Sequence, residues 1–193
     1  FIMKRFFFLL SLCATTVLCS AQSRVGTFSI IPKIGVCLSN MTDNDFLIGG
    51  KIACSPKYKA GFTGGIEGEY QLTSPFSISL AALYTMEGCR YLDESGLAAS
   101  SKVDYEGYSN HTVNLNVLNV PLTFNYYIAD GIAVKAGVQM GFAIDTNKKY
   151  KMTPFTINDR TGEHYYGTMV KYHKNTNDDY KSVDVSIPLG VSY

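Results

Sequence analysis

Residues 120–144 read VPLTFNYYIADGIAVKAGVQMGFAI, and this stretch decides the fold. Every second residue is apolar from Val120 to Tyr126, and the alternation resumes from Ile132 to Ile144 after the short IADG segment. The residues in between are mostly polar or glycine. Sustained alternation of this kind is typical of β-strands. The stretch therefore predicts a long β-hairpin with one apolar face and one polar face.

The same alternation recurs along the chain, and no helical pattern follows residue 21. Six strands are expected in all, and each carries one apolar and one polar face. The expected strands cover approximately residues 29–39, 61–72, 75–88, 112–128, 132–144 and 181–193.

The fourth expected strand changes parity once. The residues that break the pattern are Val113, Leu115 and Val117, before Leu118, Val120 and Leu122 take the other parity. A β-bulge near Val117–Asn119 would restore the facing. A strand that begins at Leu118 explains the pattern equally well.

Short and long connections alternate along the chain. The short ones lie around Thr73–Ser74 and Ala129–Asp130, and the long ones span residues 40–60, 88–111 and 145–180. Transmembrane β-barrels have short turns on one side and long loops on the other. Their strands need about 9–11 residues to cross the hydrocarbon layer, which these strands provide.

The composition of the polar face indicates which face is inside. It carries Lys33, Glu67, Glu69, Lys135 and Asp184, together with serine, threonine and glycine. This composition suits a crowded polar interior, so the apolar face is expected to contact lipid, where only a closed barrel satisfies the backbone. The alternative is a periplasmic soluble ligand-binding barrel with the two faces reversed.

Aromatic residues sit near both ends of the apolar face. This placement is typical of the two aromatic girdles at membrane interfaces. The expected girdle residues are Tyr70, Phe76, Tyr126 and Tyr193 at the short-turn ends, and Phe62, Tyr84 and Phe142 toward the long-loop ends.

The N-terminus has the three parts of a secretory signal peptide. Lys4 and Arg5 precede an apolar run, and small residues lead to a cleavage site after Ala21. The run is too short for a transmembrane anchor, which needs about 20 apolar residues. We therefore expect a signal peptide at residues 1–21 and a barrel domain at residues 22–193.

Composition and charge limit the possible partners of the chain. The 193 residues suffice for one domain, and only 17% are charged. Removing residues 1–21 removes two of the 17 basic residues and no acidic one, which leaves 15 against 16 and a net charge of −1. This balance argues against nucleic acid as a partner. The exported chain keeps Cys37, Cys54 and Cys89, which leaves either one disulfide at Cys54 or three free thiols.

Four segments resemble a known family. KIGVCLSNM, GFTGGIEGEYQL, LNVPLTFNYYI and VSIPLGVSY are similar to the small outer-membrane β-barrel ("porin family") proteins of Bacteroidota. The resemblance covers roughly residues 28–193. It implies an all-β, antiparallel, eight-stranded up-and-down barrel in the outer membrane. The expected partners are therefore outer-membrane lipid and the barrel-assembly machinery.

The sequence pattern predicts six strands, two fewer than the eight that the resemblance implies. The last two would then follow Tyr193, and the segments KKYKMTPFTI and HYYGTMVKYH would form a hairpin above the membrane. Such a fragment would expose two unpaired strand edges. The alternative places two further membrane-spanning strands inside residues 146–173.

Four charged residues are the candidate site. Lys33, Glu67, Glu69 and Lys135 all fall in the lower or middle lumen, where they are expected to form a charge network. An eight-stranded barrel is just wide enough to be filled by side chains. The network is therefore expected to plug the barrel, and the alternative is a gate for small solutes.

Catalysis and ligand binding are the other functions considered. A lipid hydrolase needs a paired nucleophile and base, and the candidates are His111, His164, His173, Ser109 and Ser182. They show no catalytic motif, so we expect no enzyme, cofactor or metal. The tyrosine-rich segment 145–180 suits an extracellular ligand.

Overall fold

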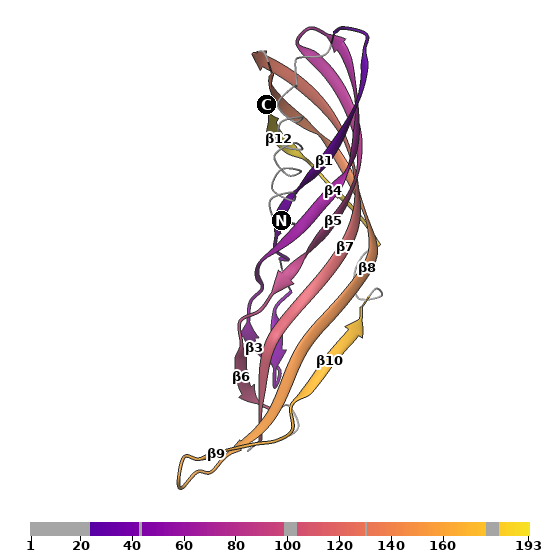
Figure 1. Ribbon diagram of the computed structural model, residues 1–193. Helices are drawn as coiled ribbons and strands as arrows, with labels where there is room; N and C mark the ends of the chain where they lie inside the picture. Colours follow the sequence, from indigo (N-terminus) through magenta and orange to yellow (C-terminus); the bar gives the residue numbers. More distant parts are fainter. Residues whose placement is uncertain (1–23, 43, 99–103, 130, 177–181) are drawn as a thin grey trace, which may run out of the picture.

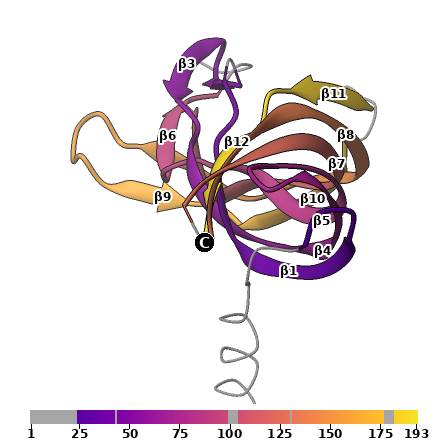
Figure 2. The same cartoon turned by 90° about the horizontal axis from the view of Figure 1, so that it is seen from above.

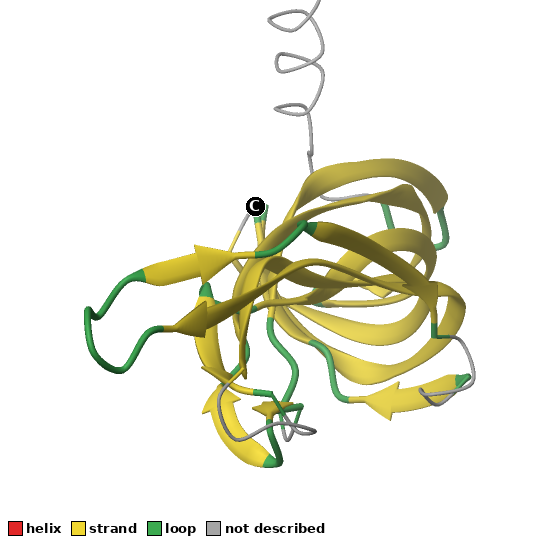
Figure 3. Ribbon diagram, turned by 90° about the horizontal axis from the view of Figure 1, so that it is seen from below, coloured by secondary structure: helices red, strands yellow, loops and turns green. Residues whose placement is uncertain are grey.

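The computed structural model describes most of the chain as β-structure. The described residues are 24–42, 44–98, 104–129, 131–176 and 182–193. All their regular elements are strands, as Figure 3 shows. None of them forms a helix long and apolar enough to cross a membrane. The expected signal peptide, with its cleavage site at Ala21, lies outside the described residues.

The described residues form twelve strands, and Figure 1 shows how they are arranged. Their bounds are β1 Phe28–Ser39, β2 Phe46–Ile48, β3 Lys51–Cys54, β4 Lys57–Thr73, β5 Phe76–Arg90, β6 Glu94–Leu97, β7 Asp104–Ala129, β8 Ile132–Ile157, β9 His164–Tyr166, β10 Val170–Asn175, β11 Val183–Ser186 and β12 Leu189–Ser192.

One antiparallel sheet organises the molecule. Its order is β1-β4-β5-β7-β8, and β9, β10, β11 and β12 pair along the far edge of β8. The strand β6 pairs with β7, whereas β2 and β3 form a separate hairpin. Figure 2 shows that the sheet curls into a half-barrel. The expected all-β antiparallel fold is confirmed.

The two faces of the curled sheet differ in polarity. On the convex face Ile34 is 82% exposed and Phe124 is 60% exposed. On the concave face Asn125 and Ser77 are almost fully buried. The apolar face therefore points outward and the polar face points inward, which contradicts the soluble barrel with reversed faces.

Cross-strand pairing places the outward aromatic residues at two levels. Phe76 pairs with Tyr126 at the short-turn end, whereas Tyr84 pairs with Leu118, which in turn pairs with Phe142. Phe76 and Tyr84 are eight residues apart, or about 26 Å along the strand. With a tilt of about 40°, this gives a band about 20 Å tall, close to the apolar band of membrane barrels. The remaining expected girdle residues, Tyr70, Phe62 and Tyr193, are also exposed.

The expected bulge near Val117–Asn119 is wrong. The strand β7 keeps one parity through this region, because Val113, Val117 and Asn119 are all buried on the concave face. The extra residue is Ile144 on β8, since Asn116 pairs with Asp145 and Val117 with Ala143. The strand also does not begin at Leu118. The apolar residues before it simply pack inside the barrel.

The long connections contain more β-structure than expected. Residues 88–111 include the end of β5, all of β6 and the start of β7. The strand β8 continues to Ile157, and β10 folds back onto its residues 147–152. The segments inside residues 146–173 therefore extend β8 into a hairpin, which overturns the reading of two further membrane spans. Polar sequence concealed these extensions because a strand outside lipid needs no apolar face.

Glycines allow the neighbouring strands to approach closely where the sheet curls. A Cβ atom on Gly65 would lie 2.0 Å from the Ala82 carbonyl oxygen, and one on Gly137 would lie 1.9 Å from that of Leu122. Both glycines belong to the inward-facing parity. They therefore support the curvature that brings distant strands together across the concave side.

Candidate functional site

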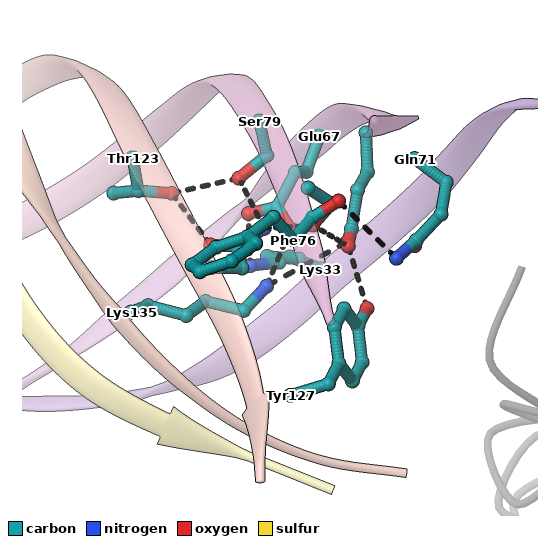
Figure 4. A network of polar contacts seen from close by, with 11 residues as sticks. Lys33, Glu67, Gln71, Phe76, Ser79, Thr123, Tyr127 and Lys135 are labelled. Atoms are coloured by element: carbon teal, nitrogen blue, oxygen red, sulfur yellow. Dashed lines mark hydrogen bonds and ion pairs between the residues drawn. The ribbon is translucent and has the colours of Figure 1, made fainter. Parts of the chain in front are cut away.

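The four predicted charged residues meet on the concave face (Figure 4). Lys33 comes from β1, Glu67 and Glu69 from β4, and Lys135 from β8. Inward parity directs each side chain into the lumen, because successive side chains of a strand point to opposite faces.

Glu67 is the centre of this charge network. Its Oε1 lies 2.9 Å from the Lys135 Nζ, and its Oε2 pairs with Lys33. Lys135 Nζ also lies 3.8 Å from Glu69 Oε2. Two acids and two bases give the network a net charge of zero. Both carboxylates are buried, with exposures of 4% and 5%, so their ion pairs are largely shielded from solvent.

The Lys135–Glu67 pair crosses the half-barrel. The strands β5 and β7 lie between β4 and β8, so in a flat sheet the two strands would be about 14 Å apart. Direct contact is achieved because the sheet curls and the side chains project into its concavity. The pair therefore ties together strands that share no backbone hydrogen bonds.

Neutral polar side chains complete the network around Glu69. Its Oε1 accepts hydrogen bonds from the Ser77 hydroxyl at 2.5 Å and the Tyr127 hydroxyl at 2.6 Å. The Asn125 amide in turn donates to Ser77 at 2.8 Å. The sequence did not single out these three partners. The one feature that could have indicated them is an inward-facing position beside a predicted buried charge.

Gln71 lies at the short-turn end of the lumen. This side chain is fully buried, and its Nε2 donates to the carbonyl of Thr73 at 2.8 Å. The same nitrogen approaches the carbonyls of Ser74 and Phe76, both at 3.3 Å. Gln71 thus satisfies backbone acceptors of the β4–β5 turn from the inside.

A second buried cluster lies inside the barrel beyond the outward apolar band. Its centre is His111, which stacks on Tyr91 with ring centroids 4.4 Å apart and meets Phe46 edge-on at 4.4 Å. Tyr150 lies 5.3 Å from His111 and stacks on Tyr172. We call these residues, together with Tyr108, the aromatic cluster.

A bulge in β7 builds the aromatic cluster. Asn110 has a positive φ of 51°, and it shares the position opposite Tyr150 with His111. One extra residue reverses side-chain parity. Tyr108 and His111 therefore reach the same side of the strand, where both contact Phe46.

Burial changes the acid–base properties of this cluster. His111 is 2% exposed, and neither ring nitrogen has a hydrogen-bond partner. Desolvation, assisted by the positive charge of Lys148, lowers the pKa of His111 to about 4. Desolvation also raises the pKa of Tyr108 and of Tyr150. His111 is therefore neutral at physiological pH and packs as an aromatic residue.

No hydrogen bond among the described residues joins a candidate histidine to a candidate serine, although Ser109 and His164 line the same cavity. His111 lacks a hydrogen bond to Ser109, and His164 stacks on Phe155 instead. His173 lies on the exposed strand β10, and Ser182 precedes β11. Within the described ranges, no group of His, Cys, Asp and Glu side chains is arranged to hold a metal ion.

Cys37, Cys54 and Cys89 are free thiols. The Cys37 thiol donates to the Met86 carbonyl at 3.3 Å, and Cys89 is buried against Tyr91. The disulfide considered at Cys54 is therefore not formed. Cys89 acts as a small apolar side chain beside the aromatic cluster.

Comparison with known proteins gives one match. A family model described as "Outer membrane protein beta-barrel domain" matches residues 20–193. No curated protein and no solved structure matches the chain.

Proposed function

The chain belongs to the outer-membrane β-barrel family, and on this basis we propose that it is a structural, non-conducting barrel that carries an interaction surface outside the membrane. The charge network across the lumen is the observation that carries this proposal. Its carboxylates and their neutral partners are buried by one another, so they occupy the space that a permeating solute needs.

Energetics favour a plug over a gate. Each network carboxylate has fixed partners on other strands, and breaking a buried ion pair by removing one partner costs about 3–5 kcal/mol. A gate must open at a cost that thermal energy or a ligand can supply. A charge-balanced network with many partners therefore suits permanent closure and a fixed barrel shape.

The interaction surface comprises the extensions of β7 and β8 with β9 and β10. Tyr165 and Tyr166 are 59% and 68% exposed there, on β9, which Figure 1 shows at the far tip of the long hairpin. Exposed aromatic rings supply a large contact area, and the Tyr hydroxyl adds a polar handle. We assign the expected extracellular ligand to this part of residues 145–180.

Further parts of the proposal rest on sequence. Export through the signal peptide at residues 1–21 and insertion by the barrel-assembly machinery follow from the targeting pattern and the family. The four resembling segments favour the porin-family branch of Bacteroidota. The lack of a hydrogen-bond partner at His111 is the one observation behind the further proposal of a role without catalysis or a cofactor.

Planar-bilayer recordings test the plug. The wild-type chain and Glu67→Ala are compared, with Lys51→Ala on the exposed β2–β3 hairpin as the control. We expect no discrete conductance from any of them, and a lower unfolding temperature for Glu67→Ala alone. A discrete conductance in the wild type whose ion selectivity changes in Glu67→Ala would instead establish a small-solute channel.

A further inference from the structure

Basic side chains form a band around the outer end of the barrel. One level of the sheet runs from Lys57 to Arg90, Thr112, Lys149 and His173, each paired with the next across neighbouring strands. Directly paired residues of an antiparallel sheet point to the same face. This level therefore places three cations and one histidine on the same face of five strands.

The next level of the sheet adds two more cations. Lys151 pairs directly with Lys171 on β10. Lys151 and Lys149 are two residues apart on β8, so both point to the same face. We call Lys57, Arg90, Lys149, Lys151, Lys171 and His173 the basic collar.

The collar lies on the face that carries the outward apolar residues. Arg90 is four residues beyond Met86, the last apolar residue of that stripe on β5. Four residues span about 13 Å along the strand, or about 10 Å in height at a tilt of about 40°. The polar layer of a bilayer is about 5–8 Å thick on each side. Because lysine stems bend back toward lipid, their ammonium groups reach this layer.

The collar has cations that the described part of the chain leaves uncompensated. All ion pairs among the described residues involve Glu67 or Glu69 in the lumen, so none of them includes a collar cation. Like charges directly opposite one another destabilise a sheet, yet Lys171 faces Lys151. An anion between these ammonium groups would remove this cost.

The neighbouring carboxylates already have hydrogen-bond donors. Asp145, on the membrane side of Lys149, accepts from the Asn147 amide at 3.0 Å. Asp93, beyond the end of β5, accepts from the Asn110 backbone N–H at 2.9 Å. Neither carboxylate forms an ion pair with a collar cation.

A groove lies beside these cations. It has a volume of about 510 Å³ and is lined by Lys149, Lys151, Lys171 and His173 together with the two stacked tyrosines of the aromatic cluster. Among the described residues near the short turns, Arg24 is the one cation beside the lumen pairs. The charge asymmetry thus selects the leaflet on the long-hairpin side.

We infer that the basic collar binds the phosphate groups of anionic lipid headgroups in the leaflet beside the long hairpins. Its position at the edge of the apolar band favours a lipid source over a soluble one. Ammonium groups bind phosphate as point charges through charge-assisted hydrogen bonds.

Lipid titration by native mass spectrometry tests this inference on the folded full chain in neutral detergent. The probes are phosphatidic acid and phosphatidylcholine of equal chain length, and inorganic phosphate is the soluble competitor. We compare the wild type with a triple variant, Lys149→Gln/Lys151→Gln/Lys171→Gln. A juxtamembrane cation strengthens binding about fivefold, so the triple variant should bind phosphatidic acid on the order of 100-fold more weakly.

Two control variants make the test specific. Lys148→Gln/Lys174→Gln removes charge from the same strands but on the other face, and it should leave binding unchanged. The triple Lys→Arg variant should retain it. If the triple Gln variant fails to show a heat-modifiable folded band, Lys171→Gln alone should give about fivefold weaker binding.

Three results would overturn the inference. They are equal affinity of the wild type and the Gln variants for phosphatidic acid, equal affinity of the wild type for both lipids, and tighter binding of inorganic phosphate than of lipid. The recordings on Glu67→Ala remain interpretable in each case, because that residue lies in the lumen and not on the collar.

Discussion

Lowering the pH from 7 to 5 should destabilise the protein through His111. The unfolded side chain has a pKa of about 6.5, whereas burial lowers the pKa of His111 to about 4 in the folded protein. Below pH 6.5 the unfolded state therefore binds more protons than the folded state. Stability is full above that pH, falls as the pH drops toward 4, and stops changing through this residue below 4.

The two pKa values set the size of the loss. Their difference corresponds to about 3 kcal/mol at low pH, and about 2 kcal/mol of this is lost at pH 5. Lys148 acts in the same direction, because its positive charge opposes a second one on the imidazole. Tyr108 and Tyr150 have raised pKa values and stay neutral throughout this range. Glu106 is the acidic residue bonded to the aromatic cluster, since it accepts a hydrogen bond from the Tyr108 hydroxyl.

Urea unfolding at pH 7 and pH 5, followed by the heat-modifiable gel band, measures this effect. The chain has no tryptophan, so fluorescence is a weaker readout. His111→Phe keeps an aromatic ring against Tyr91 and Phe46 but cannot bind a proton. It should be about 2 kcal/mol less sensitive to the pH change than the wild type.

The difference between two variants isolates His111 from the carboxylates that also titrate near pH 5. His164→Phe, in the exposed strand β9, should lose stability as the wild type does. If His111→Phe and the wild type lose the same free energy between pH 7 and pH 5, the reasoning from burial is refuted.

Two further comparisons probe the lumen through the unfolding free energy. Gly65→Ala should cost about 1–3 kcal/mol because its Cβ would press on the backbone of β5. Its control, Gly35→Ala, meets only ordinary contacts and should change stability by less than about 0.5 kcal/mol. Equal costs for the two variants would contradict the role of glycine in the curvature of the sheet. Lys135→Met should cost about 3 kcal/mol because this side chain is 14% exposed and touches both carboxylates. Lys33→Met, at 36% exposure, should cost about 1 kcal/mol; the reverse order in urea titrations would show that Lys33 is the main partner.

Within the apolar band, the sequence was sufficient to predict facing. Lipid on one side and a crowded polar lumen on the other impose opposite requirements, so alternation alone distinguishes Phe124 from Asn125. Beyond the apolar band both faces of the sheet contact water or protein, so the two faces no longer differ in the polarity that they require. The bulge expected near Val117–Asn119 was wrong for that reason, because apolar residues there enter the interior.

The lumen site was predicted in part for a similar reason. The four charged residues stood out because charges at inward positions of a narrow barrel need partners. Ser77 and Asn125 did not stand out, since such residues are common in any strand. The burial of His111 could not be predicted, because it depends on Phe46, which lies 65 positions earlier in the chain and reaches it through the β2–β3 hairpin.

The two charge distributions of the barrel have different physical consequences. In the lumen, two acids and two bases pair with one another, so the field they present to a passing ion is small. On the outer rim, cations face one another across strands, and a positive potential extends toward the leaflet. Anions are therefore attracted to the rim and not to the centre of the barrel. Mutations can therefore separate closure of the lumen from lipid binding at the rim. Neutralising Glu67 should affect stability alone, whereas neutralising Lys149, Lys151 and Lys171 should affect lipid binding alone.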